Sequence, residues 1–68
     1  MFYANRLLAK MTEKGISKND IASALGVDGA TLYRKLNGDS DFKRSEIEII
    51  RNRLALTVNE AEAIFFAD

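Results

Sequence analysis

The stretch KNDIASALGVDGATLYRKLNG, residues 18–38, has the pattern of two short helices that meet at Gly26. Ala22 lies four residues before that glycine, and its small side chain lets the two helices approach closely across the bend. The apolar anchors of this unit are Leu25, Val27, Leu32 and Leu36. Two short helices cannot enclose a core by themselves, so we predict that the rest of the chain packs behind them and leaves the second helix exposed to a partner.

Helical spacing of apolar residues continues on both sides of this unit, and strand-like alternation is nearly absent. We predict a compact, all-α domain over residues 1–68, with helices at 2–14, 18–25 and 29–36, a fourth after Ser45 and a fifth after Thr57. Ser17, Ser45 and Thr57 are each followed three residues later by an acidic residue, which is the pattern of a capping box. Asp28 is the predicted N-cap of the third helix, and Phe42 is expected to fold back onto the core.

The composition is that of a small globular domain, with 68 residues of which 47% are hydrophobic and 29% charged. There is no cysteine or histidine to form a disulfide or a zinc site. A core of this size leaves little stability to spare, so dimerisation would be a natural supplement. No apolar run approaches the ~20 residues of a membrane span, and the N-terminus lacks the pattern of a signal peptide. We therefore expect a cytoplasmic location.

Charge is unevenly distributed, although ten basic and ten acidic residues give a net charge of zero. Residues 1–53 hold all ten Lys and Arg with seven acidic residues, a net charge of +3. Residues 54–68 hold three acidic residues and no base, a net charge of −3. This asymmetry permits one basic face and one acidic end, and a mixed, solvated surface explains it about as well.

Residues 18–37 resemble the helix-turn-helix of phage repressors and Cro proteins, the Cro/repressor or XRE-like family. Ala22 and Gly26 stand at the positions of the small residue and the turn glycine, and Asn37-Gly38 is similar to the usual exit from the recognition helix. The remaining helices resemble the family's five-helix, lambda-repressor-like domain. The segments TLYRKLNG, SEIEII and AIFFAD are similar to those of small phage-encoded regulators.

The resemblance implies a sequence-specific, double-stranded DNA-binding transcriptional regulator. Its recognition helix, about residues 29–36, would enter the major groove while the preceding helix crosses the DNA backbone. Arg34 is the best candidate for direct readout, because its guanidinium fork can pair with guanine O6 and N7. Gly29 and Ala30 read little beyond shape, so specificity would lean on DNA shape as well. The predicted base contacts are Gly29, Ala30, Tyr33 and Arg34, and the predicted backbone contacts are Lys18, Thr31, Lys35, Asn37, Lys43 and Arg44.

Two positions depart from the family pattern. Asp28 replaces the usual Ser or Thr at the cap of the recognition helix, and its charge would oppose a nearby phosphate. Lys35 occupies a late recognition-helix position that is often apolar, with Leu36 taking the core role instead.

Three large apolar residues, Ile64, Phe65 and Phe66, lie together near the C-terminus. A domain of this size is not expected to bury all three side chains. An exposed apolar pair here predicts a two-fold homodimer contact. The alternative, that Phe65 completes the core and Phe66 is simply exposed, stays open.

An enzyme is disfavoured, because the chain lacks His, Cys and a Gly-rich phosphate loop, and its acidic pairs at i, i+2 point apart on a helix. No metal-ligand spacing is present, and no cofactor, metal or small-molecule substrate is expected. The serious alternative is a helix-turn-helix module that binds another protein, as an antirepressor or antitoxin does, with weak or no DNA binding. Zero net charge and Asp28 favour that alternative. The cations Arg34, Lys35, Lys43 and Arg44 favour DNA.

Overall fold

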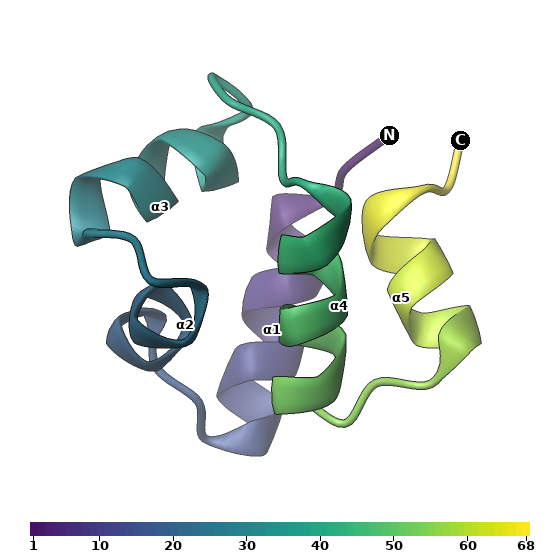
Figure 1. Ribbon diagram of the computed structural model, residues 1–68. Coiled ribbons are helices and arrows are strands. Elements are labelled where there is room, and N and C mark those ends of the chain that lie inside the picture. Colours follow the sequence, from purple (N-terminus) through teal and green to yellow (C-terminus); the bar gives the residue numbers. More distant parts are fainter.

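Five α-helices joined by short turns make up the chain in a computed structural model that describes all 68 residues (Figure 1). The helices are α1 (Ala4–Lys14), α2 (Lys18–Leu25), α3 (Gly29–Asn37), α4 (Arg44–Arg53) and α5 (Val58–Phe65). No strand is present, so the predicted all-α, five-helix fold is confirmed. None of the helices has the length and apolar character needed to cross a membrane.

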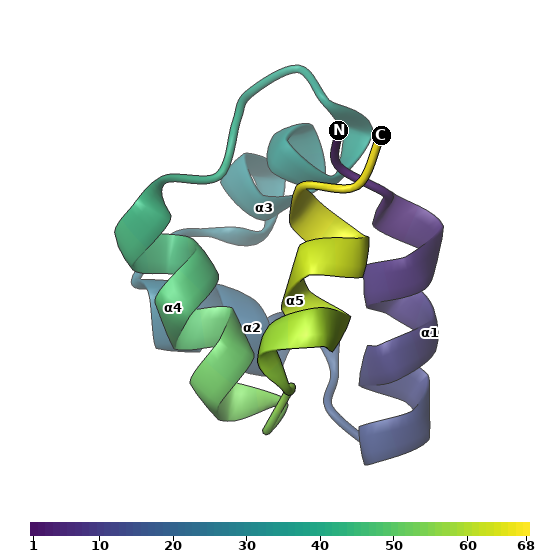
Figure 2. The same ribbon diagram turned by 90° about the vertical axis from the view of Figure 1, so that its right-hand side faces the viewer.

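Helices α2 and α3 lie at one end of the molecule and α5 at the other, with α1 and α4 between them (Figure 1). The turned view shows α5 covering the space between α1 and α4 on the side opposite α3 (Figure 2). Helix α2 packs against α3 and α4, and α5 packs against α1. The Tyr3 N–H donates to the Ile64 carbonyl at 2.8 Å, which ties the N-terminus to α5.

The core lies where these helices converge. Four side chains are essentially inaccessible to solvent, and they come from α1, α2, α4 and the turn that follows α4: Leu7, Ile21, Ile50 and Leu54. Phe42 packs with Phe2 and Phe65 in an aromatic cluster whose ring centroids are 5.1 to 5.7 Å apart. The prediction that Phe42 folds back onto the core is therefore confirmed. Burial of these side chains is the main driving force for the fold.

Side-chain caps set most of the helix starts. Ser17 with Asp20 and Thr57 with Glu60 form two of the three predicted capping boxes, with four hydrogen bonds of 2.9 to 3.1 Å. The Asp28 carboxylate accepts from the Thr31 N–H at 2.7 Å, so the predicted N-cap of α3 is also confirmed. Each cap satisfies a backbone N–H that the helix cannot pair by itself.

Three boundaries differ from the prediction. Helix α1 begins at Ala4, two residues later than expected, and α3 extends by one residue to Asn37. Helix α4 begins at Arg44 because the Lys43 N–H donates to Glu46 at 2.8 Å. The predicted cap formed by Ser45 and Glu48 is therefore wrong. The pattern was present in the sequence, but a buried carboxylate two residues earlier takes the capping role.

Gly26 makes the turn between α2 and α3 in a left-handed conformation, with φ +71°. The N–H of Val27 donates to the Ala22 carbonyl at 3.0 Å across this turn. Ala22 itself is buried against the core, as its small size predicted.

Gly26→Ala should lower the free energy of unfolding by about 1–2 kcal/mol, the cost of placing a Cβ in the left-handed region. Gly29→Ala is the matched control, because Gly29 has an ordinary φ and no atom lies within 4 Å of an added Cβ. Chemical denaturation of both variants tests this. Equal losses at the two positions would contradict the assigned role of Gly26.

Helix α5 is also held to α1 by an ion pair between Lys10 and Glu60. Lys10, together with the Thr57 N–H, lowers the pKa of Glu60 from 4.5 to about 2. A lowered carboxyl pKa stabilises the fold above the unfolded-state value. That contribution is lost as the pH falls from about 4.5 towards 2.

Glu60→Gln should therefore lower the melting temperature most near neutral pH, and the difference from the wild type should shrink below pH 4.5. Thermal unfolding of both proteins between pH 7 and pH 2 measures this. The control Asp39→Asn removes an exposed loop carboxylate that makes no ion pair, and should follow the wild type throughout. A Glu60→Gln deficit that is constant with pH would exclude the proposed electrostatic link.

Candidate nucleic-acid interface

One face of α3 is free of the core, and the four predicted base contacts lie on it. Gly29, Ala30, Tyr33 and Arg34 are all exposed, and 62% of the Tyr33 surface is accessible. Leu32, on the opposite face of the helix, is buried. This separation follows from helical geometry, because residues three and four apart share a face. An exposed helix of this diameter fits the major groove of B-DNA.

The N-terminus of α2 lies beside this face. A shallow hollow between the two helices brings Lys18 and Asn19 together with Gly29 and Tyr33, and Leu32 also lines it. The predicted phosphate contact Lys18 is thus adjacent to the predicted base contacts. Asn19 was not predicted from the sequence, although its place in the first turn of the helix that crosses the backbone is the signal that could have identified it.

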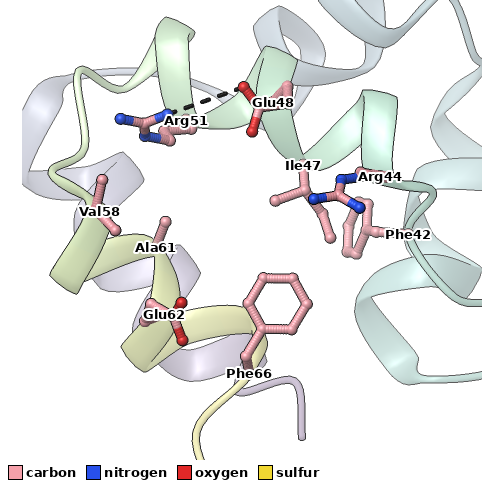
Figure 3. A pocket seen from close by; sticks show the side chains of 9 residues that line it. All are labelled: Phe42, Arg44, Ile47, Glu48, Arg51, Val58, Ala61, Glu62 and Phe66. Carbon is pink, nitrogen blue, oxygen red and sulfur yellow. Dashed lines mark ion pairs between the residues drawn. The ribbon is translucent and has the colours of Figure 1, made fainter.

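The other predicted backbone contacts occupy the ends of α3 and α4. Asn37 is the exposed last residue of α3, and Thr31 is half-buried with its N–H already donated to Asp28. Lys43 is exposed at the start of α4, with no ion pair within 4 Å. Arg44, also exposed, lies at the mouth of a groove between α4 and α5, beside Phe42 (Figure 3).

Lys35 does not fit its predicted role as a phosphate contact. Only 6% of the residue is exposed, and its ammonium group lies 3.1 Å from the Glu46 carboxylate. It also donates to the Asp41 carbonyl at 3.0 Å. The prediction is corrected, because this charge is neutralised inside the protein and does not reach the surface of α3.

The charges of this face nearly balance. Four cations, Lys18, Arg34, Lys43 and Arg44, are exposed and make no ion pair, whereas three carboxylates, those of Asp28, Asp39 and Asp41, lie on the same segments. Hydrogen bonds from Thr31 lower the pKa of Asp28, so its negative charge on this face persists to lower pH than that of an unpaired aspartate. The net electrostatic potential of this face is therefore small. Binding of DNA through this face would depend on the positions of individual cations.

Two short helices joined by a left-handed glycine, with the second helix exposed, define a helix-turn-helix DNA-binding domain. The family model for the helix-turn-helix domain of resolvase matches residues 4–39, so the chain belongs to that family. The match covers α1, α2 and α3 and ends just before α4. Searches of curated proteins and of solved structures found no match to this chain.

Proposed function

We propose that the protein is a cytoplasmic transcriptional regulator of the Cro/repressor type that binds double-stranded DNA in a sequence-specific way. The observation that carries this proposal is the exposed face of α3, where Tyr33 and Arg34 are free while Leu32 on the opposite face is buried in the core. In this arrangement α3 enters the major groove and α2 crosses the backbone. The activity is binding, with no chemical step.

The side chains divide into two roles. Arg34 pairs with a guanine, and Tyr33 contacts a base or its neighbouring phosphate. Gly29 and Ala30 allow close approach and read little else, so DNA shape supplies part of the specificity. Lys18 and Lys43 contact the DNA backbone, because they are exposed cations at the starts of the helices that precede and follow α3 in the chain.

A second candidate function is a protein-interaction module of the antirepressor or antitoxin kind. The near balance of charge on the α3 face favours it, since three carboxylates there oppose a polyanion. A salt titration separates the two functions. Binding to phosphates releases counterions and weakens steeply with salt, with a logarithmic slope of about −0.9 per phosphate contact, whereas an apolar protein interface is nearly insensitive. Undetectable duplex binding at low salt would exclude the DNA function.

Arg34→Ala should cost about 1–3 kcal/mol on the preferred duplex and relax preference at one base position. Lys43→Ala should weaken all duplexes alike and reduce the magnitude of the salt slope by about 1. Arg53→Ala is the matched control, because Arg53 is the exposed last residue of α4, at the opposite end of that helix from Lys43. Selection of duplexes from a random library, followed by titration at several salt concentrations, measures all three. Equal, sequence-independent losses for Arg34 and Lys43 would overturn this division of roles.

A homodimer is the second part of the proposal, but its predicted contacts need correction. Ile64 and Phe65 are only 2% and 6% exposed, because both complete the core from α5. Phe66 is 56% exposed and remains as the single predicted dimer contact on the surface.

Phe66 lines a groove of about 500 Å³ between α4 and α5, which we call the α4–α5 groove (Figure 3). The apolar lining comes from Phe42, Ile47, Val58, Ala61 and Phe66, and the charged lining from Arg44, Glu48, Arg51 and Glu62. Two arginines and two glutamates line this surface, so each charge of one copy has an opposite charge available on a second copy related by a two-fold axis. A second copy of the chain therefore suits this groove, and two recognition helices would then read half-sites ~34 Å apart.

Phe66→Ser should convert the dimer to a monomer without unfolding it, because the side chain contributes little to the core. Sedimentation equilibrium gives the mass, and circular dichroism confirms the fold. Ile49→Ser is the control, since Ile49 is a partly exposed aliphatic residue outside the groove. A wild-type protein that is monomeric at the concentrations where it binds DNA would refute the dimer.

A further inference from the structure

The Lys35–Glu46 ion pair joins the recognition helix to α4 inside the protein. The side chains are only 7% and 10% exposed, and the Nζ to Oε1 distance is 3.1 Å. The Lys35 ammonium also donates to the Asp41 carbonyl at 3.0 Å and lies 5.9 Å from the centre of the Phe42 ring. Every partner of this ammonium group belongs to the loop after α3 or to α4.

Stability alone is a poor explanation for this pair. Removing two charges from water is costly, and a well-packed apolar pair of similar volume is often as stable or more so. An ion pair restricts the relative orientation of the two elements that it joins, because its hydrogen bonds require defined distances and angles. Apolar contacts, in contrast, tolerate sliding and rotation. Buried polar pairs that fix a register are the best-attested use of such groups.

The ion pair connects α3, which carries the predicted base contacts, to the start of α4, where the predicted phosphate contact Lys43 lies. Lys35 directly follows Tyr33 and Arg34 on α3. Glu46 also accepts the Lys43 N–H at 2.8 Å, so the same carboxylate sets the start of α4. The Glu46 carboxylate therefore contacts both α3, through Lys35, and the backbone of Lys43. The side chain of Lys43 is a predicted phosphate contact, so this one carboxylate links the position of α3 to the position of that contact.

We propose that Lys35 and Glu46 are positioning residues for DNA recognition. Their ion pair fixes the rotation of α3 relative to the start of α4, so that Tyr33 and Arg34 meet base edges while Lys43 meets the backbone. This role rests on the proposed DNA function. It predicts that loss of the pair impairs discrimination between sequences, while attraction to DNA in general is retained.

The double variant Lys35→Met/Glu46→Gln tests this role. Methionine replaces the lysine chain up to the position of Cε with an unbranched apolar chain, and glutamine keeps an oxygen that accepts the Lys43 N–H. No buried charge is therefore left unpaired. The exposed cations are untouched. The measured quantity is the ratio of affinities for the duplex that wild type selects from a random library and for a scrambled duplex.

We expect the double variant to fold, to keep the wild-type affinity and salt slope on scrambled DNA, and to lose roughly fivefold or more of its discrimination. That factor is the lower bound for one misplaced bidentate base contact. Residual dipolar couplings of the DNA-free variant should show a changed or averaged orientation of α3 relative to α4. A purely stabilising pair would lower both affinities together with the melting temperature, and would leave this orientation unchanged in the folded protein.

Glu46→Asp is the second variant, for the case in which the double variant does not fold. It keeps both charges and withdraws the carboxylate by one methylene, so discrimination should fall by a smaller factor. Unchanged discrimination in a folded variant would overturn the positioning role while leaving the proposed function intact. Wild-type protein that binds no duplex at low salt would instead refute the proposed function, and the positioning role with it.

Discussion

No helix of this protein is long enough to be stable alone, and that constraint governs the rest of the structure. The helices have 8 to 11 residues, whereas isolated helices shorter than ~12–15 residues are marginal in water. Each one therefore needs a tertiary partner along its length and hydrogen bonds at its ends. This is why α2, α3 and α5 each begin with a side-chain cap, and why the inaccessible leucines and isoleucines come from several different segments. A helix that loses its packing has little tendency to stay formed.

The same constraint limits what the recognition helix can offer to DNA. Helix α3 has nine residues, and its inward face is already committed to Leu32, Leu36 and Lys35. Only the outward face remains, and two of the four predicted base contacts on it are Gly29 and Ala30. For this reason the proposed DNA function assigns the direct reading of bases to Tyr33 and Arg34. With so few contacts, small errors in the orientation of α3 cannot be compensated by other side chains.

Features that depend on local sequence could be predicted, and features that depend on distant contacts could not. The Gly26 turn, the small Ala22 and the caps at Ser17, Asp28 and Thr57 involve residues within a few positions of one another. Ser45 had the right local pattern, but Glu46 was recruited by Lys35, eleven residues away, and α4 started earlier. The choice between a dimer contact and a core role for Phe65 stayed open for the same reason, since the aromatic rings that bury Phe65 come from Phe2 and Phe42. The alternative in which Phe65 completes the core is confirmed.

Family membership and the individual character of this protein lie in different parts of the chain. The matched residues 4–39 hold α1 to α3, the part that any helix-turn-helix needs. Helices α4 and α5 lie outside the match. They supply Glu46, which engages the recognition helix from behind, and the α4–α5 groove. The helix-turn-helix motif provides an exposed second helix that can contact DNA. Its orientation depends on what is packed behind it, and in this protein helices α4 and α5 lie behind it. The proposed pairing with a second copy would also use these two helices.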